Sequence, residues 1–196
     1  MDADRRLDQA MQLFWRKGYF DTSVDELAAS TGLSRAAIYA DYGSKKKLFE
    51  ALLGRYRAQI TAQRLTPLQA EDAGFAQIEQ FFRQFRNLGA RGESRLGCLM
   101  CLTAAEVSPH VPSVARIVTS YLDELGRLFR RALINARKRG EVRPRTDAAR
   151  MANYLTGAVL GLMALVRSPA PRAAITHYID GVLSLLHNLQ PNPERR

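Results

Sequence analysis

A run of small residues around one arginine, Ser34-Arg35-Ala36-Ala37, carries side chains suited to close binding of a polar surface. The guanidinium of Arg35 offers N–H donors in a fixed geometry that matches a guanine edge or a phosphate. Ser34 is an N-cap candidate, so the run is expected to open a helix. Because Ser34 and Ala36 are small, the start of that helix can approach its target closely.

The residues before this run predict a second short helix and a tight turn. Ser23 lies three residues before Glu26, the spacing of a capping box, and Leu27 begins an apolar face. Gly32 then breaks the helix, because glycine tolerates a left-handed backbone. Two short helices joined by a glycine turn are typical of a helix-turn-helix, whose second helix enters the major groove of DNA. An ordinary helical hairpin on the surface is the alternative.

The DNA contacts expected from this arrangement come from the second helix and the residues flanking the motif. Tyr39 lies one turn after Arg35 and can place its hydroxyl on a phosphate. Lys45 lies in the first turn of the next helix, where free N–H groups and the helix dipole favour an anion. The expected DNA-binding residues are Thr22, Ser34, Arg35, Ala36, Tyr39 and Lys45.

The same stretch resembles the DNA-binding domain of the TetR family of bacterial transcriptional regulators. The matching residues are Gly18-Tyr19-Phe20, Thr22-Ser23-Val24, Leu27-Ala28, Gly32-Leu33-Ser34, Ile38-Tyr39 and Tyr42-Gly43-Ser44-Lys45. The chain departs from the family at Asp41 and Tyr42, where histidine and then phenylalanine are usual. The resemblance implies a helix-turn-helix domain over residues 1–47 and a helical effector-binding and dimerisation domain over 48–196. Residues 48–63 would be the connecting helix that transmits ligand binding.

Composition is consistent with a folded protein that has an acidic partner. The chain has 196 residues, 46% of them hydrophobic, and a net charge of +10. The excess lies mostly outside the motif, since residues 1–63 hold 10 basic and 8 acidic residues and residues 64–196 hold 19 and 11. The charge therefore supports DNA binding less than the motif does. Residues 151–166 are apolar but short for a bilayer, so we expect a cytoplasmic protein without a membrane span.

Later helices show apolar stripes for a core or a ligand pocket. Phe75, Ile78, Phe82 and Phe85 share one helix face, which is usually core and alternatively walls an apolar pocket. The expected effector site comprises Phe82, Phe85, Tyr121, Leu125, Cys98 and Cys101, and its ligand would be small and apolar or electrophilic.

The two cysteines, Cys98 and Cys101, are too few for a secreted disulfide framework. On a regular helix their thiols would share a face. A lone CxxC is a poor zinc site, so no metal is expected. One reading is two small core residues. By resemblance, Gly97-Cys98-Leu99-Met100 and the following Ala-Ala-Glu look like a TetR subgroup in which the cysteine after glycine senses electrophiles or oxidants. That chemistry requires a thiolate.

Together these features predict an all-α protein with an N-terminal three-helix helix-turn-helix domain and a larger C-terminal helical domain. Asp147–Val166 and Ala173–Leu189 are apolar over more surface than one neighbour covers, which favours a homodimer. The predicted function is a repressor that binds a palindromic DNA operator and is released by an effector. An enzyme has little support, because no nucleophile–base set and no phosphate-binding loop is evident, and no cofactor is expected. A helical ligand-binding or scaffold protein without DNA binding is the remaining alternative.

Overall fold

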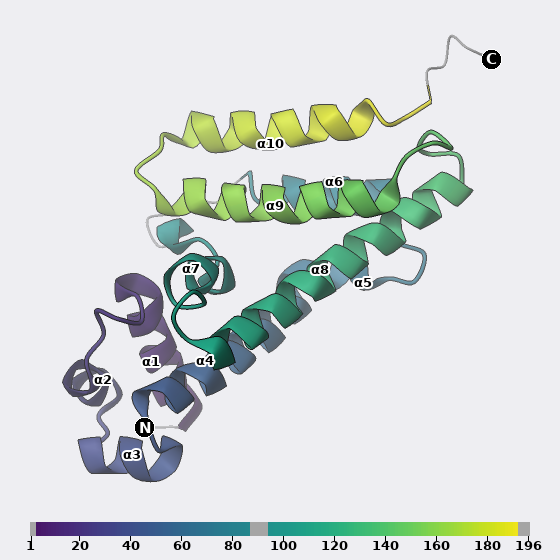
Figure 1. The fold of residues 1–196 in the computed structure, drawn as a ribbon. Coiled ribbons are helices and arrows are strands. Elements are labelled where there is room, and N and C mark those ends of the chain that lie inside the picture. Colours follow the sequence, from purple (N-terminus) through teal and green to yellow (C-terminus); the bar gives the residue numbers. More distant parts are fainter. Residues whose placement is uncertain (1–2, 87–93, 192–196) are drawn as a thin grey trace. The chain divides into compact units, whose positions relative to one another are not determined.

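The computed structural model describes residues 3–86 and 94–191, and within these ranges the chain forms helices and turns without a β-strand (Figure 1). The all-α class predicted from sequence is confirmed. In chain order the elements are α1 (Ala3–Lys17), α2 (Val24–Thr31), α3 (Arg35–Tyr42), α4 (Lys45–Ile60), the π-helix η1 (Thr61–Leu65), α5 (Thr66–Gln69), α6 (Phe75–Arg83), the 3₁₀-helix η2 (Ser94–Leu96), α7 (Leu99–Glu106), α8 (Pro112–Lys138), α9 (Ala148–Arg167) and α10 (Arg172–His187).

Two compact units make up the chain. Unit 1 contains Met1–Ile60 and Cys98–Tyr121, and unit 2 contains Thr61–Gly97 and Leu122–Arg196. Helices α4 and α7 therefore pack with the three N-terminal helices. The domain boundary after residue 47 stays a prediction from the family resemblance.

The helix boundaries in unit 1 follow from the capping residues. The hydroxyl of Ser23 accepts the Glu26 N–H at 3.2 Å, and the Glu26 carboxylate accepts the Ser23 N–H at 2.9 Å, so the predicted capping box is present. Gly32 ends α2 with a φ of 68°. Ser34 then caps α3 by accepting the Ala37 N–H at 3.1 Å. These local hydrogen bonds satisfy backbone donors that a helix start leaves unpaired.

An apolar core holds the helices of unit 1 together. The rings of Phe14 in α1 and Phe49 in α4 lie 4.9 Å apart between centroids. Leu27 of α2 and Ile38 of α3 are 0% and 1% exposed. Because each helix contributes a fully buried side chain, the exposed face of α3 is held on a packed scaffold.

Two glycines of unit 1 are expected to respond to alanine with opposite signs. Gly32→Ala should destabilise the protein by about 1 kcal/mol, because an alanine at φ of 68° is strained. Gly54→Ala in α4 should stabilise it by about 0.5–1 kcal/mol, since a Cβ there would meet nothing within 4 Å and the helix gains propensity. Urea unfolding of both variants beside the wild type measures this. If both variants changed the free energy of unfolding by the same amount and in the same direction, the left-handed conformation of Gly32 would be contradicted.

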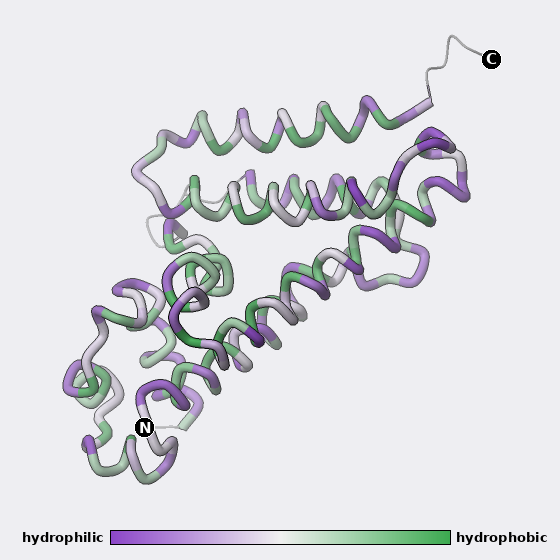
Figure 2. The backbone as a smooth tube through the Cα atoms, in the orientation of Figure 1, coloured by the Kyte–Doolittle hydropathy of each residue, from purple (hydrophilic) through white to green (hydrophobic). Residues whose placement is uncertain are grey.

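In unit 2, α9 and α10 lie side by side, and green hydrophobic positions recur along both (Figures 1 and 2). Asp147 caps α9 by accepting the N–H groups of Ala149 and Arg150, each at 3.0 Å, as the sequence predicted. A Cβ at Gly161 would lie 2.6 Å from the Tyr178 hydroxyl of α10, so the glycine permits this close packing. The observed helices agree with the predicted segments to within two residues.

Helix α9 has 20 residues and is apolar enough, by length and composition, to cross a membrane. The apolar stretch expected to be short for a bilayer, residues 151–166, lies within this longer helix. A single helix of this kind is weak evidence for a membrane span, since core helices of globular proteins pass the same test. Leu155, Leu162 and Val166 of this helix are at most 1% exposed.

Candidate DNA-binding interface and cysteine site

Helix α3, labelled in Figure 1, has exposed residues on one face and a buried residue on the other. Ser34, Arg35, Ala36 and Tyr39 are exposed, and Tyr39 is 45% exposed despite its large ring. Ile38 anchors the opposite face in the core at 1% exposure. Four of the predicted DNA-binding residues thus share one accessible surface on a helix of two turns, which is the arrangement that major-groove readout requires.

The guanidinium of Arg35 lies 3.2 Å from the Asp25 carboxylate of α2. The two side chains are 62% and 70% exposed. A surface ion pair of this kind is worth at most about 1 kcal/mol. Arg35 is therefore positioned over the helix-turn-helix by Asp25 but remains available to a stronger partner.

Thr22 and Lys45 occupy different places from those predicted. Thr22 is 1% exposed, and its hydroxyl donates to the Gly18 carbonyl at 2.6 Å, so the expected phosphate contact from this side chain does not fit the structure. The Lys45 ammonium donates to the Thr22 carbonyl at 2.7 Å and lies 4.5 Å from the centre of the Tyr19 ring. Burial lowers the pKa of Lys45, while Glu106, Asp21 and Glu26 oppose that shift. Thr22 and Lys45 therefore tie the turn before α2 to the start of α4.

Two lysines next to Lys45 were not among the predicted phosphate-binding residues. Lys46 and Lys47 are exposed in the first turn of α4. The Lys47 N–H is capped by the Ser44 hydroxyl at 3.1 Å. The run of three lysines was visible in the sequence, but only tertiary packing shows which ammonium groups are free to meet a phosphate.

Cys98 precedes α7 instead of lying within it, which corrects the expectation of two thiols on one regular helix. Its backbone is extended, with φ of −111° and ψ of 126°, and it occupies the N-cap position of α7. Cys101 is in the first turn of the helix. The side chains of Cys98 and Cys101 share a hydrogen bond, so the two thiols face each other. They are 7% and 8% exposed and both free.

The surroundings of Cys98 favour a thiolate. Hydrogen bonds lower its pKa to about 6, first from the Cys101 thiol, then from the Tyr56 hydroxyl and the backbone N–H groups of Cys101 and Met100, against the opposing effect of burial. The Cys101 thiol donates to Cys98 and is itself buried, so its pKa is raised well above the ordinary value. The Tyr56 hydroxyl accepts the Leu99 N–H at 3.2 Å, which leaves its own hydrogen for Cys98. The start of α7 thus contributes to the low pKa of Cys98, together with two neighbouring side chains.

The remaining predicted effector residues lie in the cores of the units. Phe82 and Leu125 of unit 2 are 0% exposed, and Phe85 is 6% exposed. The rings of Phe82 and Phe85 each pack on Phe81, at 5.4 and 5.2 Å between centroids. Tyr121 belongs to unit 1 and is 3% exposed. In this conformation the aromatic side chains of the stripe pack against one another.

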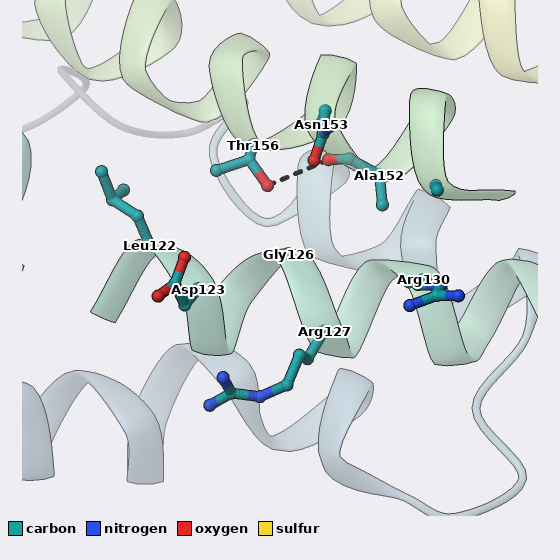
Figure 3. A pocket seen from close by; sticks show the side chains of 9 residues that line it. Leu122, Asp123, Gly126, Arg127, Arg130, Ala152, Asn153 and Thr156 are labelled. Atoms are coloured by element: carbon teal, nitrogen blue, oxygen red, sulfur yellow. Dashed lines mark hydrogen bonds between the residues drawn. The ribbon is translucent and has the colours of Figure 1, made fainter. Parts of the chain in front are cut away.

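An open groove of about 440 Å³ lies elsewhere in unit 2, between α8 and α9 (Figure 3). It is lined by Leu122, Asp123, Gly126, Arg127, Arg130, Ala149, Ala152, Asn153 and Thr156. The Thr156 hydroxyl donates to the Ala152 carbonyl at 2.9 Å, and Arg127 extends away from α9. None of the predicted effector residues lines this groove. Across residues 3–86 and 94–191, no cluster of three or more His, Cys, Asp or Glu side chains is suited to a metal ion.

The fold and the exposed α3 face define a helix-turn-helix DNA-binding regulator. Residues 7–52 match the family model for bacterial regulatory proteins of the tetR family, and residues 74–182 match that of the tetracyclin repressor-like C-terminal domain. The chain therefore belongs to the TetR family, whose members are transcriptional repressors that bind DNA. Dimer formation and ligand binding are typical of this family.

Similar proteins and solved structures agree with this assignment. The transcriptional repressor ComR of Escherichia coli is 29% identical over 170 residues, which cover 86% of this chain and 81% of ComR. A TetR regulator from Chloroflexus aurantiacus is 26% identical, with a TM-score of 0.83 and coverage of 95% and 94%. A cysteine mutant of the TetR-family regulator CifR, solved with a 26-bp double-strand operator DNA, is 25% identical, with a TM-score of 0.82 and coverage of 94% and 96%.

Proposed function

We propose that this protein is a cytoplasmic dimeric repressor that binds a palindromic operator through α3 and releases it when Cys98 is oxidised or alkylated. The exposed surface of α3, with Arg35 beside small residues, is the observation that carries the DNA-binding part. The N-cap position of Cys98 and its thiolate-stabilising partners carry the regulatory part.

In this proposal Arg35 pairs with a guanine edge or a phosphate, and Ser34, Ala36 and Tyr39 form the rest of the groove surface. Lys46 and Lys47 contact phosphates, because their ammonium groups are exposed at the start of α4. Lys45 acts indirectly by holding the turn before α2. Affinity would come largely from phosphate contacts and would fall steeply with salt.

Dimerisation is proposed through α9 and α10. Tyr154 and Leu185 are large apolar side chains that are 44% and 47% exposed. A Cβ at Gly157 or Gly181 would meet nothing within 4 Å, so these faces are open to a neighbouring helix. Exposed apolar residues beside small ones suit an interface between two copies related by a twofold axis.

A dimer fixes the distance between its two recognition helices, so the spacing of the operator tests it. Inserting about five base pairs between half-sites turns one half-site to the other face of the DNA and should reduce affinity to that of a single half-site. Sedimentation at the DNA-binding concentration should give a dimer. A monomer whose affinity is indifferent to the insertion would contradict this part. Absence of any DNA binding would instead favour the scaffold alternative.

The proposed thiol chemistry begins with the Cys98 thiolate. With a peroxide, its sulfur attacks one oxygen and the O–O bond breaks, so Cys98 sulfenic acid forms. The other oxygen leaves as hydroxide, or as an alkoxide that takes a proton from water to become the alcohol. The Cys101 thiol can then attack the sulfenic sulfur, forming a disulfide and releasing water. With an activated alkene, the same thiolate adds to one carbon of the double bond, the π bond breaks, and the resulting carbanion takes a proton from water to leave a thioether. Either product removes the hydrogen bonds that Cys98 shares with Cys101 and Tyr56.

Thiol reagents are the better supported effector class. An apolar ligand at the predicted aromatic stripe would have to displace rings that already pack on one another, such as Phe81 and Phe82. Cys98 is also buried, at 7% exposed, but a peroxide is small and needs less space than an apolar ligand would.

A further inference from the structure

Helix α7 contacts the turn between α1 and α2 at the end opposite to Cys98. A carboxylate oxygen of Glu106, the last residue of α7, accepts the Phe20 N–H at 3.1 Å across 86 residues of sequence. The same carboxylate is fitted against Gly18, where an added Cβ would lie 2.7 and 2.9 Å from its two oxygens. Gly18 also has a φ of 92°. The turn is thus shaped to receive this one side chain.

A second contact joins the same two segments. The ring of Phe20 meets the ring of His110, in the turn after α7, edge to face at 5.8 Å between centroids. Phe20 is 51% exposed, and its ring also meets that of Tyr19 edge to face at 5.2 Å between centroids. On the other side of the turn, Lys45 donates to the Thr22 carbonyl and is kept charged in part by Glu106. The turn is therefore clamped between α7 and the start of α4.

This turn leads directly into the DNA-binding helices. Its last residue, Ser23, is the N-cap of α2 and forms the capping box with Glu26. Helix α2 then meets α3 through the Gly32 turn, and Asp25 of α2 pairs with Arg35 of α3. A displacement of the turn would therefore move the start of α2 and, with it, the surface that meets DNA.

We propose that Glu106 is a positioning residue for DNA binding, which holds the turn between α1 and α2 and couples it through α7 to the Cys98 site. Helix α7 has eight residues and spans about 12 Å, short enough to shift as one body. Its first turn is held by the Tyr56 hydroxyl, which accepts the Leu99 N–H, and by Cys98. Modification of Cys98 disturbs that end, and Glu106 carries the disturbance to Phe20. This inference rests on the DNA binding and the thiol response proposed above.

The sign of the effect distinguishes positioning from simple electrostatics. Removing a negative charge from a DNA-binding unit should strengthen binding if charge alone matters. Loss of the hydrogen bond from Glu106 to the turn should instead weaken it. Glu71→Ala is the matched control, because Glu71 is an exposed carboxylate in unit 2 and its removal changes the net charge equally.

The experiment compares the full-length wild type with Glu106→Ala, Glu106→Gln and Glu71→Ala, reduced and peroxide-treated, on an operator selected from random DNA. Glu106→Ala should weaken operator binding by about tenfold, since it removes a hydrogen bond to a charged group. Glu106→Gln should stay within about threefold of wild type, because its amide oxygen can accept the same N–H. Amide exchange at Phe20 should accelerate in the alanine variant only. Peroxide should cause a smaller additional loss in that variant than in wild type.

Each outcome decides the matter. Unchanged affinity and unchanged Phe20 exchange in Glu106→Ala would overturn the inference while leaving the repressor in place. If Glu106 has only a structural role, Glu106→Ala should lower the unfolding temperature but keep the wild-type ratio of oxidised to reduced DNA affinity. That result would also overturn the inference. A wild type that binds DNA but ignores peroxide would remove the coupling to Cys98. A wild type that binds no DNA would refute the proposed function, and the inference with it.

Discussion

Arg35→Ala is expected to weaken specific operator binding by about fivefold to 150-fold, the range for one bidentate base contact. The residue opens α3, is 62% exposed, and forms a surface ion pair with Asp25. Since no buried group depends on it, the unfolding temperature should not change. Titration of a labelled operator by fluorescence anisotropy measures the affinity, with unrelated DNA as the competitor.

Two further variants separate the roles that Arg35 can play. Arg35→Lys keeps the charge but loses the bidentate fork, so it should retain affinity for a phosphate and lose discrimination at a guanine. Arg127→Ala removes an exposed arginine from unit 2 and controls for net charge. If Arg35→Ala loses no more affinity than Arg127→Ala, Arg35 does not contact the operator.

Treatment of the wild type with peroxide is expected to weaken operator binding by a factor of about 5 to 150, the usual range of coupling between sites. Cys98→Ser should keep its affinity after the same treatment. Cys101→Ser should still form sulfenic acid, but it should not form the internal disulfide. Mass spectrometry of each treated protein identifies the product. An equal loss of binding in wild type and Cys98→Ser would place the sensitivity elsewhere in the chain.

The pH dependence of this reaction follows from the lowered pKa of Cys98. The thiolate is the reactive form, so the rate should rise about tenfold per pH unit below the pKa of about 6 and level off above it. An ordinary thiol would still be gaining reactivity up to about pH 8.5. Alkylation of Cys101→Ser followed between pH 5 and 9 reports Cys98 in isolation. The serine hydroxyl can still donate a hydrogen bond to the Cys98 sulfur, so the midpoint should stay well below that of an ordinary thiol.

The sequence predicts local features of the DNA-binding helices because they depend on neighbouring residues. The capping box of Ser23 and Glu26, the left-handed Gly32 and the cap at Ser34 each involve residues within a few positions. These signals were sufficient to predict the helix-turn-helix and its exposed residues.

Side-chain direction was less predictable, because it depends on distant packing. Thr22 looked free to bind a phosphate, yet its hydroxyl turns back to Gly18. Lys45 was expected to bind a phosphate at the start of its helix, yet its ammonium group lies over the Tyr19 ring. Cys98 has no typical N-cap side chain, so the start of α7 could not be located from residue type. The contact of Glu106 with Phe20 joins residues too far apart in sequence for any local pattern to predict.

The most direct test of whether α3 reads a DNA sequence is to select binding fragments from random DNA. The reduced wild-type protein is used for the selection, and the selected sites are then footprinted. We expect one enriched, twofold-symmetric site that the protein binds with a dissociation constant of about 10 nM or tighter at physiological salt. Protection should cover two half-sites about one helical turn, or a multiple of it, apart. Failure to enrich any site, or binding equal to that of unrelated DNA at the same salt, would contradict the assignment of α3 as a sequence-reading helix.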